Sequence, residues 1–174
     1  MESNTKGAAT FYQYKLIKKI NITNTFMRIY LSLLPISIVL ETLFVSWWSI
    51  FFLIIAAPIV VWIQYVISRS VLLITGHPII KRWRTSYQLP WLGYMPDQYI
   101  NYRLFRKVQL HNFWIGLCIA TFFIVWSPPA FTVSLVICHM WLLLPRIFIL
   151  LRLRREDSEG MLKFSSTDVS YYSQ

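Results

Sequence analysis

The chain has few charged residues, and acidic residues are especially scarce. Only 14% of its 174 residues are charged, and 7 Asp and Glu stand against 17 Lys and Arg, which gives a formal net charge of +10. A soluble domain typically has about 25% charged residues, and a soluble nucleic-acid module spreads its cations over a polar surface. The 56% content of hydrophobic residues also excludes a disordered basic tail. The class that remains is a small integral membrane protein with basic flanks.

Cysteine and glycine are scarce as well, with two and five residues. Both cysteines, Cys118 and Cys138, lie inside apolar runs, which argues against an extracellular disulfide framework. His139 is expected at a similar depth, but a tetrahedral zinc site needs a fourth ligand. The five glycines form no phosphate loop, and neither a carboxylate pair nor a Ser, His and Asp triad is apparent. We therefore expect no enzyme, no bound metal and no cofactor.

Two long runs of the sequence are almost free of charge. Between Arg28 and Arg69 the one charged side chain is Glu41, and the run between Lys107 and Arg146 has none. One bilayer span needs about 20 apolar residues. Each run is therefore long enough for two spans, whereas a single helix of that length would exceed the hydrocarbon core.

A turn is expected near the middle of each run. The first run contains Trp47-Trp48-Ser49, and Trp prefers the membrane interface. The second contains Ser127-Pro128-Pro129, and paired prolines stop a helix. The predicted spans are residues 29–47, 50–75, 110–126 and 130–151.

The basic residues indicate the orientation of these spans. They fall before the first span, at the end of the second span or between the second and third, and at or after the end of the fourth, and neither turn contains Lys or Arg. They are Lys6, Lys15, Lys18, Lys19, Arg28, Arg69, Lys81, Arg82, Arg84, Arg103, Arg106, Lys107, Arg146, Arg152, Arg154, Arg155 and Lys163. With four spans all three regions lie on one face, and the positive-inside rule makes that face cytoplasmic. We expect a multi-pass protein of the cell membrane with both termini in the cytoplasm and no cleavable signal peptide.

The predicted fold is an all-α membrane protein, with four transmembrane helices as two hairpins and an interfacial amphipathic helix between them. It has five regions. They are a basic amphipathic leader (1–28), a first hairpin (29–75), a cytoplasmic or interfacial loop with an amphipathic helix (76–109), a second hairpin (110–151) and a flexible cytoplasmic tail (152–174).

The leader contains an amphipathic stretch over residues 11–20, whose pattern fits a strand and a helix equally well. In either form it would place apolar groups on the bilayer and direct Lys15, Lys18 and Lys19 to anionic headgroups or to a cytoplasmic partner. These three lysines are candidate contact residues.

The loop between the hairpins predicts a second contact surface. Residues 83–96 are aromatic and broken by proline and glycine, which favours an interfacial loop. Asp97 suits an N-cap, and residues 97–110, termed here the elbow helix, follow it. The apolar stripe of the elbow helix is Ile100, Leu104 and Val108, and its candidate partner or lipid contacts are Arg103, Arg106 and Lys107.

Two polar side chains inside the predicted spans are candidate intramembrane contacts. Glu41 is the one acid within a span, and a charge at that depth is paired, protonated or close to an end. His139 is expected mid-span, where a histidine commonly bonds across helices. In the tail, Tyr171-Tyr172 is interpreted as a loose end or a short recognition element.

The opening third of the chain shows an aromatic and basic leader followed by an apolar hairpin. The residues are Tyr12-Gln13-Tyr14-Lys15, Ile20, Ile29-Tyr30 and Leu34-Pro35-Ile36. Over about residues 11–70 this order resembles the TcpE-type membrane proteins of Gram-positive conjugative elements, which include the ConD-like component. A typical member has one hairpin, whereas this chain is expected to have two, so the resemblance does not extend to residues 108–151.

The resemblance implies a subunit of a type IV secretion channel, beside the cytoplasmic conjugation ATPase, that helps DNA and relaxase cross the membrane. It brings no catalytic residues. We therefore expect a non-enzymatic membrane component of a conjugative DNA-transfer apparatus, whose partners are membrane lipids and other conjugation-machine subunits, including a secretion ATPase. Self-association and DNA contact stay open, because charge counting does not separate DNA from lipid. The alternative is a stand-alone transporter, immunity protein or regulator, and a transporter should have a polar cavity that contains Glu41 or His139.

Overall fold

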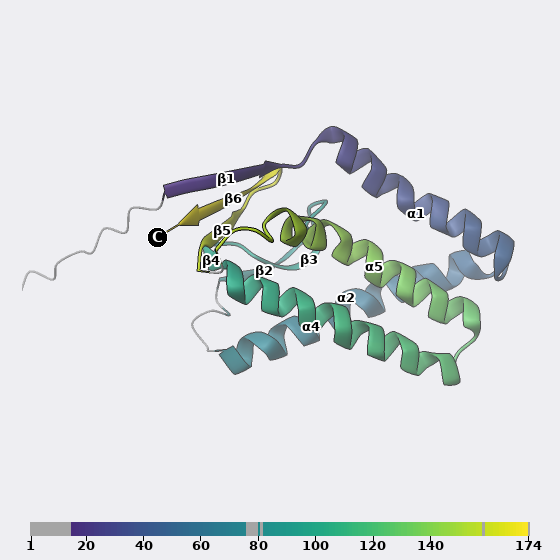
Figure 1. The fold of residues 1–174 in the computed structure, drawn as a ribbon. Coiled ribbons are helices and arrows are strands. Elements are labelled where there is room, and N and C mark those ends of the chain that lie inside the picture. Colours follow the sequence, from purple (N-terminus) through teal and green to yellow (C-terminus); the bar gives the residue numbers. More distant parts are fainter. Residues whose placement is uncertain (1–14, 76–79, 81, 158, 174) are drawn as a thin grey trace, which may run out of the picture.

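A computed structural model of the chain describes residues 15–75, 80, 82–157 and 159–173. In this part of the chain, long helices lie side by side and the strands gather at one end of them (Figure 1). The helices are α1 (Asn24–Phe44), α2 (Ser49–Thr75), α4 (Tyr102–Phe122) and α5 (Pro129–Arg152). A short 3-10 turn, η1 (Phe123–Val125), joins α4 to the outer turn before α5.

The helices confirm the prediction of four apolar segments. Each one is long and apolar enough to cross a membrane. The chain runs away from the strands along α1, back along α2, away again along α4 and back along α5 (Figure 1). Two outer turns at the far end, residues 45–48 and 126–128, therefore lie opposite the strands.

Helix α4 starts at Tyr102, inside the predicted elbow helix of residues 97–110. It continues into the predicted third span as one helix, which agrees with an elbow helix that leads directly into that span. The expected N-cap at Asp97 is wrong. The cap is Asn101, whose Oδ1 accepts a hydrogen bond of 2.8 Å from the Arg103 backbone N–H. Such a side-chain oxygen satisfies one of the free amides of a first helical turn.

Helix α1 packs mainly against α5 through aromatic residues near the strands. Phe26 and Phe148 have ring centroids 4.6 Å apart, and Tyr30 stacks on Trp141 at the same centroid distance. The Trp141 Nε1–H also donates to the Tyr30 carbonyl oxygen at 2.9 Å. Most of the remaining surface of α1 is exposed and apolar, as expected for a helix whose outer side meets lipid.

Helices α2, α4 and α5 pack closely against one another. Small buried residues lie where they meet, including Ala56 on α2 and Gly116 and Ala120 on α4. Small side chains let helix backbones approach, which is a common basis of packing between membrane helices. This three-helix contact forms one of the two hydrophobic clusters of the molecule.

The strands form a small folded unit, called here the head. A four-stranded antiparallel sheet has the order β1-β6-β5-β4, and β2 pairs with β3 in a separate hairpin. The strands are β1 (Lys15–Asn21), β2 (Trp83–Ser86), β3 (Gly93–Pro96), β4 (Ile100–Asn101), β5 (Met161–Phe164) and β6 (Asp168–Ser173). The predicted all-α fold is therefore corrected to a mostly helical fold that carries a β-sheet head.

The prediction of a flexible tail is wrong, because the C-terminal segment contributes two strands to the head. Residues 161–164 and 168–173 form β5 and β6, and β6 pairs along its whole length with β1, from Lys15 opposite Ser173 to Asn21 opposite Asp168. The leader pattern that fitted both a strand and a helix is therefore a strand over residues 15–21. The Tyr171 side chain, predicted to be a loose end, is 1% exposed.

The aromatic segment 83–96 also differs from its prediction. It folds as the β2–β3 hairpin rather than as an irregular loop, and Trp83, Trp91 and Tyr94 belong to the hydrophobic core of the head. The same core includes Leu72 of α2 and Ile149 of α5. Because helix residues complete the core of the head, the sheet and the helices form one continuous unit.

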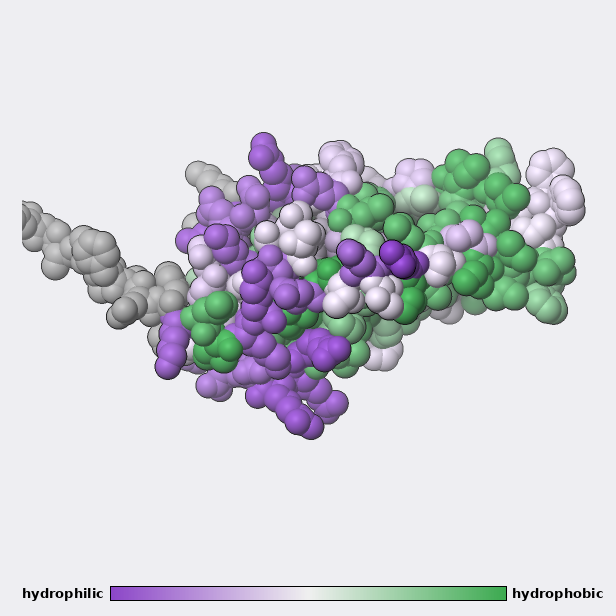
Figure 2. All heavy atoms as spheres, turned by 90° about the horizontal axis from the view of Figure 1, so that it is seen from above, coloured by the Kyte–Doolittle hydropathy of each residue, from purple (hydrophilic) through white to green (hydrophobic). Residues whose placement is uncertain are grey.

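The surface has two contrasting zones. Hydrophilic residues gather around the head and the adjoining helix ends, and hydrophobic residues cover most of the helices (Figure 2). The described Lys and Arg side chains of β1, β2, β5 and the first turns of α4 all belong to the hydrophilic end. This distribution is compatible with a multi-pass membrane protein.

Candidate functional site

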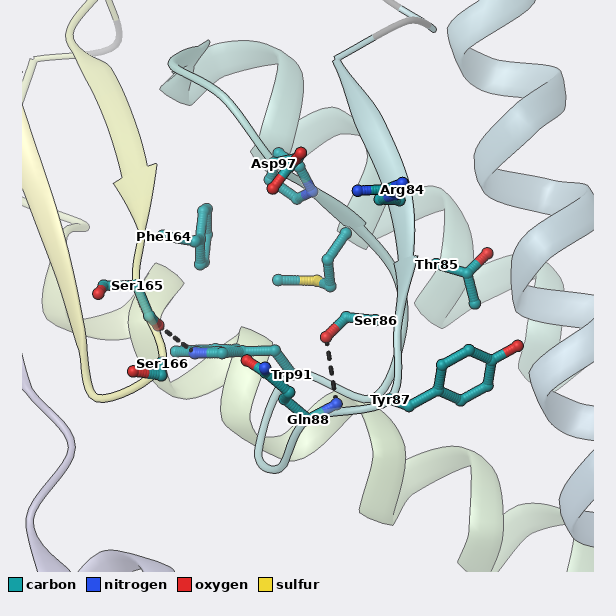
Figure 3. Close-up of a pocket in the computed structure, with 12 residues that line it drawn as sticks. Arg84, Thr85, Ser86, Tyr87, Gln88, Trp91, Asp97, Phe164, Ser165 and Ser166 are labelled. Atoms are coloured by element: carbon teal, nitrogen blue, oxygen red, sulfur yellow. Dashed lines mark hydrogen bonds between the residues drawn. The ribbon is translucent and has the colours of Figure 1, made fainter.

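A cavity of about 450 Å³ lies in the head, between the β2–β3 hairpin and the turn that joins β5 to β6 (Figure 3). No local pattern in the sequence indicates it, because its two walls come from segments far apart along the chain. The lining residues are Arg84, Thr85, Ser86, Tyr87, Gln88, Trp91, Met95, Pro96, Asp97, Phe164, Ser165 and Ser166.

Trp91 connects the two walls of this cavity. Its indole Nε1–H donates to the Ser165 carbonyl oxygen at 2.8 Å, and its ring meets the Phe164 ring edge to face at 5.2 Å. Gly93, which follows in the chain, has a φ of +99°, a conformation that favours glycine and lets the chain turn into β3. These contacts fix the floor of the cavity.

The rim of the cavity carries opposite charges. Arg84, Ser86 and Asp97 lie on the side of the β2–β3 hairpin, and Ser165 and Ser166 lie on the side of the β5–β6 turn (Figure 3). A cation, an anion and several hydroxyls above an aromatic floor suit recognition of a polar segment of another chain.

The candidate basic residues of the elbow helix lie together on α4. Arg103, Arg106 and Lys107 are exposed on its first two turns, and the spacing of three and four residues places them on one face. The opposite face buries Leu104 and Val108, two members of the predicted apolar stripe. The three cations therefore form an accessible basic patch beside the head, called here the α4 patch.

The candidate lysines of the leader lie on the edge strand β1. Lys15 is exposed, whereas Lys18 Nζ pairs with Glu156 Oε1 at 2.8 Å and Lys19 Nζ lies 3.6 Å from Asp168 Oδ1. Two of the three lysines thus help to join β1 to the end of α5 and to β6. The structure separates this group from the α4 patch, because β1 and β4 lie at opposite ends of the sheet.

Glu41 is buried between α1 and α5 near the outer turns. Its side chain is 2% exposed, and Oε1 accepts a hydrogen bond of 2.5 Å from the Ser134 Oγ–H. Its backbone carbonyl accepts from the Val45 N–H at 2.9 Å, which closes the last turn of α1. Glu41 therefore contacts a neighbouring helix of its own chain.

His139 lies in the contact between α2, α4 and α5. Its Nδ1 is 3.3 Å from Gln64 Nε2, and the ring packs so closely on Gly116 that a Cβ there would overlap the His139 ring atoms. The cavity beside His139 has a volume of about 10 Å³, which is about the space of one water molecule. Glu41 and His139 do not share a hydrogen-bond network, since their described partners lie in different helix contacts.

Cys118 and Cys138, which were expected near His139 in depth, differ in environment. Cys118 is exposed on α4, whereas Cys138 is 4% exposed in the hydrophobic cluster of the three helices. Within residues 15–75, 80, 82–157 and 159–173, no group of three His, Cys, Asp or Glu side chains has the geometry to hold a metal ion.

Arg146 is a polar residue whose role the sequence-based prediction missed. It lies inside α5, which ends at Arg152, and its side chain is 1% exposed. Its Nη2 group donates a hydrogen bond to the carbonyl oxygen of Leu92, in the loop that leads into β3. The signal was present in the sequence, because apolar residues flank Arg146 on both sides. A buried guanidinium that bonds to the β2–β3 hairpin anchors the head to the bundle.

Comparison of the chain with protein-family models, with curated proteins and with solved structures finds no match.

Proposed function

We propose that the chain is a non-enzymatic integral membrane component of a conjugative DNA-transfer apparatus that assembles beside a cytoplasmic secretion ATPase. In this proposal four helices cross the cell membrane as two consecutive hairpins and the head lies in the cytoplasm with both termini. The basic start of α4 lies at the headgroup level. The head and the α4 patch are the docking surface for the partner.

The observation that carries the proposal is the exposed α4 patch beside a folded head. Arg103, Arg106 and Lys107 are on the solvent side of a helix whose other side completes the core of the head. A rigid basic surface attracts an acidic partner and raises the rate of correctly oriented encounter. The cavity between the β2–β3 hairpin and the β5–β6 turn offers a recess of about 450 Å³ in the same head for a segment of that partner.

The alternative of a small transporter receives less support. A transporter would need a polar cavity at His139 or Glu41, whereas the cavity beside His139 measures about 10 Å³. Glu41 is engaged with Ser134, a residue of the same chain. Both residues are better explained by packing of the helices against one another.

The test is co-purification of the full-length chain with the secretion ATPase encoded by the same element, from membranes of the native host. The variant Arg103→Gln/Arg106→Gln/Lys107→Gln is expected to lose most of the ATPase signal while it inserts into the membrane at the normal level. Deletion of the gene is expected to abolish transfer of the element.

A matched control removes the same charge elsewhere on the exposed surface. Arg154→Gln/Arg155→Gln/Lys163→Gln also lowers the net charge by three, and all three side chains are exposed outside the α4 patch. This control variant should still co-purify with the ATPase. Equal loss in both variants would show a general charge effect, and unimpaired mating after deletion would contradict the proposed function.

A further inference from the structure

A second cavity lies where the head meets the helix bundle. It has a volume of about 250 Å³ and opens between β1, the beginning of α1 and the end of α5. We call it the junction cavity. Its lining residues are Lys18, Lys19, Ile20, Asn21, Thr23, Phe26, Phe148 and Arg152.

The polar side of the junction cavity is cationic. Lys18 is held in place, because its Nζ donates to the Arg152 carbonyl oxygen at 3.0 Å and pairs with Glu156 at 2.8 Å. Lys19 is only loosely paired, at 3.6 Å from Asp168. The exposed Arg152 guanidinium lies over the Phe148 ring, 5.3 Å from its centroid. Lys19 and Arg152 therefore have hydrogen-bond donors to offer a ligand.

The start of α1 adds to this positive potential. Thr23 caps the helix by accepting a hydrogen bond from the Phe26 N–H at 3.3 Å, and the first turn of α1 contains no acidic residue. The positive end of the helix dipole is therefore not offset by an acid within its own turn. This contribution supports the three cationic side chains and does not replace them.

The other side of the junction cavity is apolar and aromatic. Phe26 and Phe148, whose rings are 4.6 Å apart, form this side. Both residues lie close to the point where an apolar, membrane-length helix begins or ends. For helices that cross a membrane this is the level of the lipid headgroups.

From this juxtaposition we infer that the junction cavity binds the phosphate headgroup of an anionic phospholipid, with the glycerol and the first part of the acyl chains against the phenylalanine rings. Guanidinium and ammonium groups recognise phosphate oxygens through charge-assisted hydrogen bonds. A basic pocket between helix ends on the cytoplasmic side is a known solution for anionic headgroups. The inference is separate from the α4 patch and holds whether or not an ATPase docks there.

The experiment is native mass spectrometry of the full-length chain, purified in neutral detergent and supplied with phosphatidylglycerol or phosphatidylcholine. The chain should retain phosphatidylglycerol in preference. The variant Lys19→Gln/Arg152→Gln should bind phosphatidylglycerol about 30-fold more weakly, the expected loss for two basic residues near an anionic lipid surface. The charge-preserving variant Lys19→Arg/Arg152→Lys should keep the preference.

Two controls separate the site from general electrostatics and from free phosphate. Arg154→Gln/Arg155→Gln removes two exposed cations just beyond the cavity and should change binding little. Equal loss in both neutralised pairs would overturn the inference. Inorganic phosphate should not displace the lipid, and displacement would show that the cavity takes free phosphate instead. Circular dichroism checks that each variant is folded. If the Gln variant is misfolded, the preference of the unmodified chain for phosphatidylglycerol and the competition with inorganic phosphate decide the result.

Discussion

At the scale of single residues, three pairs of buried polar side chains join neighbouring helices of the bundle. Glu41 meets Ser134, Gln64 meets His139, and the Asn112 Nδ2–H donates to Ser68 Oγ at 2.7 Å. In a membrane such pairs replace the hydrogen bonds that water would otherwise make. Each pair joins a different set of helices, so together they fix how far each helix is rotated.

The pair of Glu41 with Ser134 predicts a measurable coupling between α1 and α5. Ser134→Ala and Glu41→Leu are each expected to lower the free energy of unfolding by about 1 to 3 kcal/mol, because a buried group loses its partner or its packing. The double variant should lose less than the sum, with a coupling of about 0.6 to 1.7 kcal/mol. Reversible unfolding in mixed micelles measures these values.

Ser37→Ala is the control for this cycle, because the Ser37 Oγ–H donates to the Leu34 carbonyl of its own helix. It should show no coupling with Glu41→Leu. Additive losses of Ser134→Ala and Glu41→Leu would contradict the interhelical hydrogen bond.

Replacing Gly116 by alanine is expected to lower the free energy of unfolding, although this substitution usually stabilises a helix. Ala is normally favoured over Gly inside a helix by about 1 kcal/mol. Here the added Cβ would overlap the His139 ring, so Gly116→Ala should lower the free energy of unfolding by about 1 to 3 kcal/mol. The same substitution in a His139→Ala background should be neutral or stabilising. A gain in stability from Gly116→Ala alone, measured in the same micelle assay, would show that the ring does not pack there.

At the scale of elements, the helices follow from the sequence more directly than the strands. The two charge-free runs and their turn residues predict four apolar helices, and the ends of α2 and α5 almost coincide with those of the predicted spans. The strands depend on pairing between β1 and β6, which lie at opposite ends of the described chain. Local patterns carry no information about a partner so distant, so the amphipathic stretch of the leader stayed undecided and the tail was predicted as flexible.

The aromatic residues of segment 83–96 show a second limit of prediction from the sequence. Tryptophan and tyrosine are typical of the membrane interface and also of a small folded core. Trp83, Trp91 and Tyr94 are all buried and pack inside the head. Composition alone does not separate these environments. The cavities of the head could not be predicted from the sequence either, because each is formed by elements that are distant in the sequence.

A substitution in strand β6 tests whether the C-terminal segment is folded into the head. Tyr171 is 1% exposed, its hydroxyl donates to the Asp157 carbonyl oxygen at 2.7 Å, and burial raises the pKa of its phenol. Tyr171→Ala should destabilise the head by about 3 to 5 kcal/mol, the usual cost of removing a large buried aromatic side chain. Hydrogen exchange should then accelerate in β1 and β6.

The adjacent residue is the matched control for this substitution. Tyr172 is partly exposed, so Tyr172→Ala should accelerate exchange much less. Rapid exchange of β6 amides in the unmodified chain would show that the tail is mobile after all.

At the scale of the whole molecule, the head and the bundle share one core, and positive charge is concentrated at their shared end. Ile149 of α5 and Leu72 of α2 pack among head residues, and Arg146 bonds to the loop before β3. The outer turns contain no Lys or Arg. We propose that the four helices span the membrane and hold the folded head on its cytoplasmic face, and this is the central claim to test.

The most direct test is labelling of intact cells with a membrane-impermeant maleimide. Single cysteines are placed in a Cys118→Ser/Cys138→Ala background, at the outer turn by Trp47→Cys and in the head by Ser166→Cys, and both positions are exposed. The account predicts labelling of Trp47→Cys in intact cells and of Ser166→Cys only after the cells are opened. Labelling of Ser166→Cys in intact cells, with protection of Trp47→Cys, would contradict it.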